Sequence, residues 1–217
     1  MLVLASASPR RRELLTQAGY SFEVHPADIP EDPYPYEDPL AYVTRLAREK
    51  AQAAYNELST SPEPDHPEIM GAPGPDSGTW EAMNLNPPLF SSLAVLGADT
   101  TVTLDNHILG KPSDPADAAR MLRLLSGRTH RVITGVALVT ANSTEVAAEV
   151  TAVHFLTPSD EEIAAYISTG EPMDKAGAYA IQGRAARWIP RIEGCYFNVV
   201  GLPIARVSTL LESAGIS

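Results

Sequence analysis

The segment from Ser6 to Arg12 holds the first residues whose types and spacing suggest chemistry. An apolar stretch, Leu2 to Ala5, ends in small residues, and Pro9 then suits the first turn of a helix. A helix beginning here directs free backbone N–H groups and its positive dipole end to one place. Three consecutive arginines in that first turn oppose the dipole, and a bound phosphate would resolve the conflict. We therefore predict a phosphate site, against the alternative of an exposed basic turn that aids solubility.

Lys50 is the second candidate. It falls inside the apolar stripe of a long helix, whereas Arg45 and Arg48 are expected to point away from that stripe. A lysine on the packed side of a helix needs an anion or a route to water. An anion site and a lysine that snorkels along the helix edge are equally open at this point. The residues of the stripe are Leu40, Val43, Ala47, Ala54 and Leu58.

Asp99 is the third candidate, because it follows an apolar strand expected over residues 93–98. In α/β enzymes this is a common place for catalytic or metal-binding groups. A carboxylate suits Mg²⁺, which also binds substrate phosphates. The alternative is a turn aspartate that caps its own backbone. The acidic loop from Pro26 to Asp38 could supply a second carboxylate.

Two further segments carry polar groups in turns. Lys111 stands between Gly110 and a proline, on a stiff turn that presents its ammonium group, although the phosphate-binding P-loop pattern is absent. Gln182 precedes Gly183 and could read a nucleobase edge by hydrogen bonding. An ordinary loop is the alternative for Gln182, and the residues alone do not separate the two. His130 is expected to be structural, since no second histidine follows at ligand spacing.

The elements that must position these residues alternate loosely between strands and helices, which predicts a mixed α/β sheet. Residues 59–92 are rich in Pro, Gly and Ser and are expected to form a flexible insertion loop. Expected strands cover 2–5, 22–25, 93–98, 101–104, 132–139, 146–155 and 196–200, with a hairpin turn at 105–107. Expected helices cover 9–18 with Ser8 as N-cap, 38–58, 115–125, a helix from the capping box Ser159–Glu162 to about Ser168, and 203–213.

Composition narrows the functional class. The net charge of −11 argues against nucleic acid or an anionic membrane surface as the main partner. The single cysteine, Cys195, excludes an internal disulfide framework and is expected to be a buried small hydrophobe. No apolar run approaches the roughly 20 residues needed to cross a bilayer, and the apolar start is too short for a secretory signal. We expect a cytoplasmic protein.

Taken together and in order, these segments resemble the Maf family. The resemblance runs nearly from residue 1 to 217, so we expect a single Maf-like domain interrupted by the 59–92 insertion. The matching pieces are Ser6-Ala7-Ser8-Pro9-Arg10-Arg11, Ala47-Arg48-Glu49-Lys50-Ala51, Gly97-Ala98-Asp99-Thr100, Gly110-Lys111-Pro112, Leu125 to His130 with Thr134-Gly135, Glu171-Pro172 through Gln182-Gly183, and Tyr196 to Pro203.

The resemblance implies a fold, an activity and a set of residues. The implied fold is an elongated mixed sheet flanked by helices, with two lobes around a nucleotide cleft, similar to inosine triphosphate pyrophosphatases. The implied activity is hydrolysis of a nucleoside triphosphate to the monophosphate and pyrophosphate with Mg²⁺ or Mn²⁺. Asp99 would accept the proton of the attacking water or ligate the metal. The metal positions would be Asp99 and Glu31, with Asp28 and Asp32 as competitors of Glu31. The substrate-binding positions would be Ser8, Arg10, Arg11, Lys50, Thr100, Lys111 and Gln182, of which Arg10, Thr100 and Gln182 would tune substrate choice.

The segment from Asp174 to Gly183 is similar to the branch of the family that acts on dTTP and UTP, and the family resemblance also implies a homodimer. Two other classes of function are weighed against the enzyme. One is a nucleotide sensor that regulates septum formation without cutting its ligand, and the retained carboxylate and lysines disfavour it. The other is a nucleic-acid-binding module, which the negative charge and the lack of interleaved aromatic and basic residues disfavour.

Overall fold

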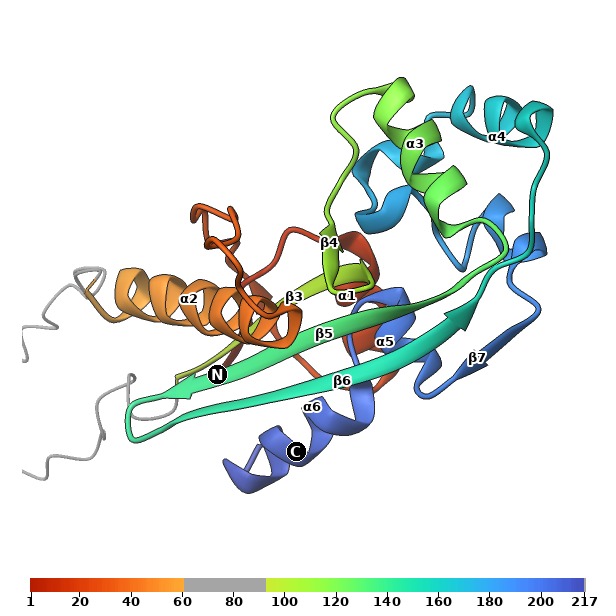
Figure 1. The fold of residues 1–217 in the computed structure, drawn as a ribbon. Coiled ribbons are helices and arrows are strands. Elements are labelled where there is room, and N and C mark those ends of the chain that lie inside the picture. Colours follow the sequence, from red (N-terminus) through yellow and green to blue (C-terminus); the bar gives the residue numbers. More distant parts are fainter. Residues whose placement is uncertain (61–92, 217) are drawn as a thin grey trace, which may run out of the picture.

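The computed structural model describes residues 1–60 and 93–216. It shows a seven-stranded mixed sheet with helices on both faces, which confirms the expected α/β class (Figure 1). The expected insertion loop, residues 59–92, begins inside the end of a helix, and its remainder, from residue 61, lies outside the described residues.

The strands follow the order β2-β1-β3-β5-β6-β7, and β4 pairs with β3 beyond the end of β1. Strand β1 is parallel to β2 and β3, whereas the other pairs are antiparallel. Strands β3, β5 and β6 form the long centre of the sheet. The bounds are β1 Leu2–Leu4, β2 Glu23–Val24, β3 Ala94–Leu104, β4 His107–Leu109, β5 Thr129–Thr140, β6 Thr144–His154 and β7 Arg191–Glu193.

Most of the expected helices are confirmed. The capping box predicted at Ser159 and Glu162 has both of its hydrogen bonds. The α-helices are α1 Pro9–Gln17, α2 Pro39–Thr60, α3 Pro115–Leu125, α4 Asp160–Ile167, α5 Tyr196–Val200 and α6 Ile204–Ser213, and the short 3₁₀ turns are η2 Glu171–Asp174, η3 Ala176–Ala178 and η4 Arg184–Trp188.

A gap between β1 and β4, along one side of β3, provides the place of the candidate site. Strand β1 pairs with β3 only as far as Leu96, and β4 joins the same edge at Val102. Among the described strands, residues 97–101 of β3 therefore pair with β5 alone. The chain leaving β1 turns directly into α1, so the first turn of that helix stands beside the gap.

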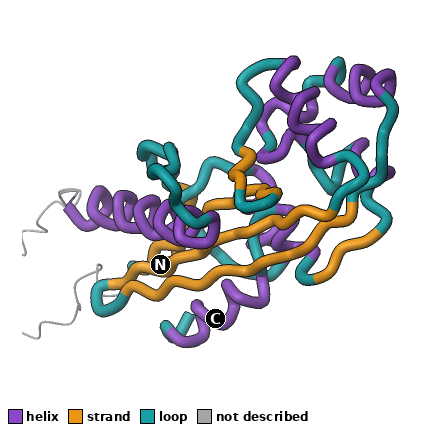
Figure 2. The backbone as a smooth tube through the Cα atoms, viewed as in Figure 1, coloured by secondary structure: helices purple, strands orange, loops and turns teal. Residues whose placement is uncertain are grey.

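Helices cover the two faces differently, as Figure 2 shows in the same view as Figure 1. Helix α2 packs on β3 and β5 so closely that a Cβ at Gly97 would lie 2.1 Å from the Ala47 carbonyl oxygen. A Cβ at Gly135 would likewise lie 2.4 Å from the Val43 carbonyl oxygen. Helices α1, α5 and α6 share an apolar cluster on the other face. Helices α3 and α4 and the 3₁₀ turns form a separate cluster with one end of the sheet, which gives the elongated, two-part shape.

Four expectations about the elements were wrong. The strands expected at 93–98 and 101–104 are one strand, so Asp99 lies in its middle and not at an end. Residues 196–200 form helix α5 and no strand, because this turn brings the Asn198 amide onto the carbonyl oxygen of Val132 at 3.0 Å. Leu40, expected in the packed stripe, is 46% exposed, while Arg45, expected to point away, is 11% exposed in its side chain.

Candidate functional site

The centre of the site is a lysine held between two carboxylates. Lys50 Nζ donates to Asp99 Oδ1 at 2.8 Å and lies 2.5 Å from Glu31 Oε1. Helix α2 supplies Lys50, the stretch of β3 that pairs with β5 alone supplies Asp99, and the loop before α2 supplies Glu31. Lys50 and Asp99 are each 7% exposed, so this is a nearly buried ion pair. The anion required by a lysine on the packed side of α2 is therefore present within the protein itself.

Electrostatics join this cluster to two further cations. Burial alone would raise the pKa of Glu31, but the hydrogen bond and charge of Lys50, together with the charges of Lys111 and Arg11, hold that pKa below its ordinary value. The carboxylate is thus ionised at neutral pH. The effect of Lys111 and Arg11 on this pKa means that both cations lie within electrostatic range of Glu31.

Arg11 is engaged as a brace inside the protein. Its Nε donates to the Gly201 carbonyl at 2.9 Å, and its Nη1 donates to Ser6 Oγ and to the Ala98 carbonyl at 3.1 and 2.8 Å. Its Nη2 donates to Thr100 Oγ1 at 3.0 Å. Burial lowers the pKa of Arg11, although the charges of Asp99 and Glu31 act in the opposite direction. An arginine has five N–H donors, so little of this guanidinium remains for a phosphate.

Thr100 belongs to the same internal network. Because side chains alternate along a strand, Thr100 faces the side of β3 opposite to Asp99. Its Oγ1 lies 2.9 Å from Thr134 Oγ1, and Thr134 donates in turn to the Asn198 carbonyl at 3.2 Å. The structure therefore places Thr100 at the gap without bringing its side chain beside Lys50.

Arg10 lies within electrostatic range of a second group of charges. Burial would raise the pKa of Asp174, but hydrogen bonding and charge from Lys175, with the charge of Arg10, lower it. Burial and Glu171 raise the pKa of Tyr166 of α4, and the charge of Arg10 acts in the opposite direction, so Arg10 lies within electrostatic range of α4 as well. Lys175 is only 9% exposed and was not predicted as a site residue. Its position next to Asp174 within a glycine-rich segment is the one sequence signal that marks it.

Gln182 is exposed on a segment that is held at both ends. The Ala180 N–H donates to Tyr166 Oη at 3.3 Å, and Tyr166 donates to Glu171 Oε1 at 2.9 Å. The Arg184 N–H donates to the same Glu171 carboxylate at 3.1 Å. The side chain between these anchors is free to meet a ligand.

The two remaining predicted residues are less constrained. Ser8 stands at the N-cap of α1 but makes no capping hydrogen bond with its side chain. Its hydroxyl and the first N–H groups of α1 therefore stay available beside the gap. Lys111 is exposed, and the neighbouring Gly110 carbonyl accepts from the Gly177 N–H at 3.0 Å, which ties the Lys111 turn to η3.

The carboxylates fit a divalent cation that also binds phosphates. Within residues 1–60 and 93–216, no group of three or more His, Cys, Asp or Glu side chains is arranged to hold a metal. Mg²⁺, however, is commonly bound by one or two carboxylates, with waters and phosphate oxygens completing its shell. Glu31 and Asp99 converge on one cation position, which suits that arrangement. Of the three competing acids, Glu31 contacts Lys50, and no such contact joins Lys50 to Asp28 or Asp32 in the described chain.

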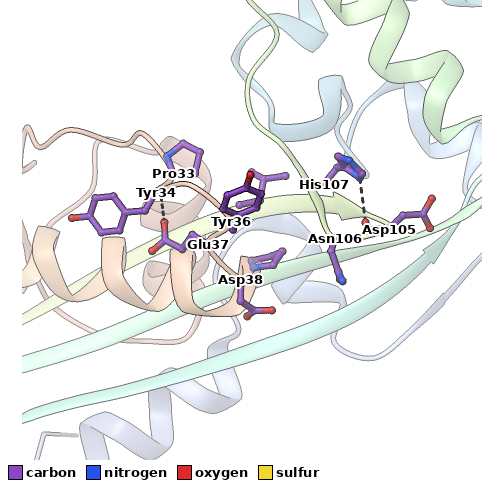
Figure 3. A pocket seen from close by; sticks show the side chains of 10 residues that line it. Pro33, Tyr34, Tyr36, Glu37, Asp38, Asp105, Asn106 and His107 are labelled. Atoms are coloured by element: carbon purple, nitrogen blue, oxygen red, sulfur yellow. Dashed lines mark hydrogen bonds between the residues drawn. The ribbon is translucent and has the colours of Figure 1, made fainter.

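A cavity of about 580 Å³ lies elsewhere. It is formed by the loop at the start of α2 and by the β3–β4 hairpin turn, and Figure 3 shows Tyr36 and His107 on its two sides. None of the predicted site residues lines it. This cavity and the carboxylate–lysine cluster are thus different places. No helix in the described part of the chain is long and apolar enough to span a membrane.

Known proteins resemble this chain over nearly its whole length. The family described as Maf-like protein matches residues 1–214. A dTTP/UTP pyrophosphatase of Koribacter versatilis is 50% identical over 215 residues, covering 99% of this chain and 95% of the relative. Proteins of the same name from Shewanella oneidensis and Aromatoleum aromaticum are 46% and 44% identical, each over 99% of this chain and over 98% and 95% of their own lengths. The chain belongs to the Maf family.

Proposed function

We propose that this protein hydrolyses nucleoside triphosphates, with dTTP and UTP as substrates, to the nucleoside monophosphate and pyrophosphate. The names of relatives that are 44–50% identical over nearly the full chain support the activity and the substrates. The observation that carries the proposal is the Lys50–Asp99–Glu31 cluster beside the first turn of α1. Carboxylates and cations at one sheet-edge gap are the groups that phosphoryl chemistry uses.

The reaction requires a water oxygen to bond to the α-phosphorus while the bond from that phosphorus to the oxygen bridging to the β-phosphate breaks. We assign to Asp99 the orientation of this water and the acceptance of its proton. Pyrophosphate leaves with the electron pair of the broken bond. Arg10, Lys50 and Lys111 spread the negative charge of the phosphates, and the N–H groups of α1 add partial positive charge.

Glu31 and Asp99 would hold the divalent cation, Mg²⁺ or Mn²⁺, which when bound neutralises phosphate charge. Arg11 serves the site from behind, since its hydrogen bonds hold α1, β3 and the Gly201 turn together. The exposed amide of Gln182 is assigned to the base, because it can both donate and accept hydrogen bonds.

The test is release of pyrophosphate from a panel of common and modified triphosphates with Mg²⁺ or Mn²⁺. We expect dTTP and UTP to be cut, and Asp99→Asn to abolish turnover while the far-UV circular dichroism stays that of the wild type. Wild-type turnover in Asp99→Asn would show that Asp99 is misassigned. Binding of dTTP without any product would favour the nucleotide sensor instead.

The proposal also includes a homodimer in the cytoplasm, without nucleic acid or membrane as partner. The charge of −11 supports the exclusion of both anionic partners. Light scattering after size-exclusion chromatography measures the assembly, and a monomer at micromolar concentration would contradict the dimer.

A further inference from the structure

The loop that carries Glu31 has no regular structure of its own. Residues 30–38 form neither helix nor strand, apart from a turn at 35–36. Glu31 is 48% exposed in its side chain, so packing of that side chain does not fix its position. Tyr42 of α2 donates its hydroxyl hydrogen to the Glu31 carbonyl at 2.8 Å, which holds one end of the loop.

Arg45, one turn further along α2, holds the remainder of this loop, from Asp32 to Glu37. Its guanidinium forms a two-pronged bridge to Glu37, with Nε–Oε1 at 2.7 Å and Nη2–Oε2 at 2.8 Å. Nη2 also donates to the Asp32 carbonyl at 3.2 Å, and Nη1 donates to Glu49 on α2 at 3.2 Å. The ring of Tyr34 lies 4.0 Å from the guanidinium carbon. One side chain thus contacts the loop at Asp32, Tyr34 and Glu37.

This clamp is more than a surface ion pair. The side chains of Arg45 and Glu37 are 11% and 9% exposed, and paired geometry of this kind is the strong form of an arginine–carboxylate bridge. The loop closes on itself as well, because the Tyr34 N–H donates to Glu37 Oε2 at 2.9 Å and the Glu37 N–H to the Tyr34 carbonyl at 3.0 Å. The hydrogen bond from Arg45 holds the pKa of Glu37 below its ordinary value.

We propose that Arg45 is a positioning residue for Glu31: its guanidinium fixes the loop on α2 and so sets the Glu31 carboxylate against Lys50. The consequence for turnover rests on the proposed function, whereas the ordering of the loop does not. Arg45 touches no reacting group. Its effect passes through the backbone from Asp32 to Glu31.

The experiment compares Arg45→Lys, which keeps the charge but loses the paired geometry, with Arg48→Met as a control on the exposed side of the same helix. We expect kcat/KM for dTTP to fall about 10- to 100-fold in Arg45→Lys, as for a small misplacement of a catalytic group. Arg48→Met should stay within about 2-fold of the wild type, because surface substitutions away from special features are usually near neutral. Glu37→Gln breaks the same clamp from the loop side and should reproduce the effect if the Arg45 variant folds poorly.

Two readouts separate positioning from general damage. In a Glu31→Gln background, Arg45→Lys should lower kcat/KM by less than about 2-fold more, because coupled residues are not additive. Hydrogen exchange of the Tyr34 and Glu37 amides, measured without substrate, should speed up in Arg45→Lys and not in Arg48→Met. Losses that multiply in the double variant, or unchanged exchange in Arg45→Lys, would overturn the proposal. If the wild type releases no pyrophosphate, the proposed function fails, while the exchange result still decides whether Arg45 orders the loop.

Discussion

Replacing Lys50 with methionine tests the core of the site. The change removes the ammonium but keeps a long unbranched side chain on α2. Removing one partner of a buried ion pair typically costs about 3–5 kcal/mol, because the remaining charge is left uncompensated. Asp99 is 10% exposed in its side chain and bears that loss, whereas Glu31 is 48% exposed and can turn toward water. We therefore expect the free energy of unfolding to fall by about 2–3 kcal/mol at pH 7.

The assay is urea unfolding followed by circular dichroism, with Lys111→Met as the matched control. Lys111 is exposed, so its substitution should change the free energy of unfolding by less than about 0.5 kcal/mol. For a chain of this size, the Lys50→Met loss corresponds to a Tm lower by about 4–12 °C. Added Mg²⁺ should restore part of the stability, because a cation can again lie between the carboxylates.

The stability difference between the wild type and Lys50→Met should also depend on pH. In the wild type, burial opposes ionisation of Glu31 but Lys50, Lys111 and Arg11 lower its pKa overall. Glu31 therefore stabilises the fold above its ordinary pKa, and this contribution is lost as the pH falls through the lowered one. Lys50 supplies the largest of the interactions that lower this pKa, so Glu31 stabilises the Lys50→Met variant less than the wild type. The deficit of Lys50→Met should therefore shrink between pH 7 and pH 4, as the wild type loses this contribution. A deficit below about 1 kcal/mol that is the same at both pH values would refute the pairing.

Three further predictions each concern the replacement of one residue. Arg11→Met removes four hydrogen bonds, and we expect a loss of about 3 kcal/mol in urea unfolding, while exposed Arg12→Met stays within about 0.5 kcal/mol. Gly97→Val forces α2 away from β3, so it should lower the free energy of unfolding by about 3 kcal/mol or more and reduce turnover. Gly110→Ala is the control and should change neither quantity, because the added Cβ meets no atom within 4 Å. Burial lowers the pKa of His130 to about 4, so between about pH 6.5 and 4 the unfolded chain binds a proton at this residue that the folded chain does not bind. The free energy of unfolding should therefore fall as the pH drops from about 6.5 to 4. His130→Gln should flatten that slope in acid titrations monitored by fluorescence.

Local signals in the sequence were sufficient for several elements. Helix α3 has the predicted bounds, Pro115–Leu125, because its proline start and apolar spacing lie within the helix itself. The capping box at Ser159 is equally local. The position of Lys50 on the packed side of α2 also followed from the helical period of its own segment, whereas the choice between an anion site and a lysine that snorkels to water did not. Each of these depends on residues a few positions apart.

The assembly of the site was decided by contacts between distant residues. Asp28, Glu31 and Asp32 competed for the second carboxylate of the site, and only the path of the loop across α2 shows that Glu31 is the one in contact with Lys50. The position of Arg11 in the first turn of α1 predicts a phosphate ligand, yet its N–H groups donate to the carbonyl oxygens of Gly201, 190 residues away, and of Ala98 in β3. The residues of α5 have the composition of a strand but form a helix, because the Asn198 amide finds its partners on β5 and β6. A sequence pattern gives the preference of a segment, whereas a buried polar group is satisfied by whichever partners the fold brings to it.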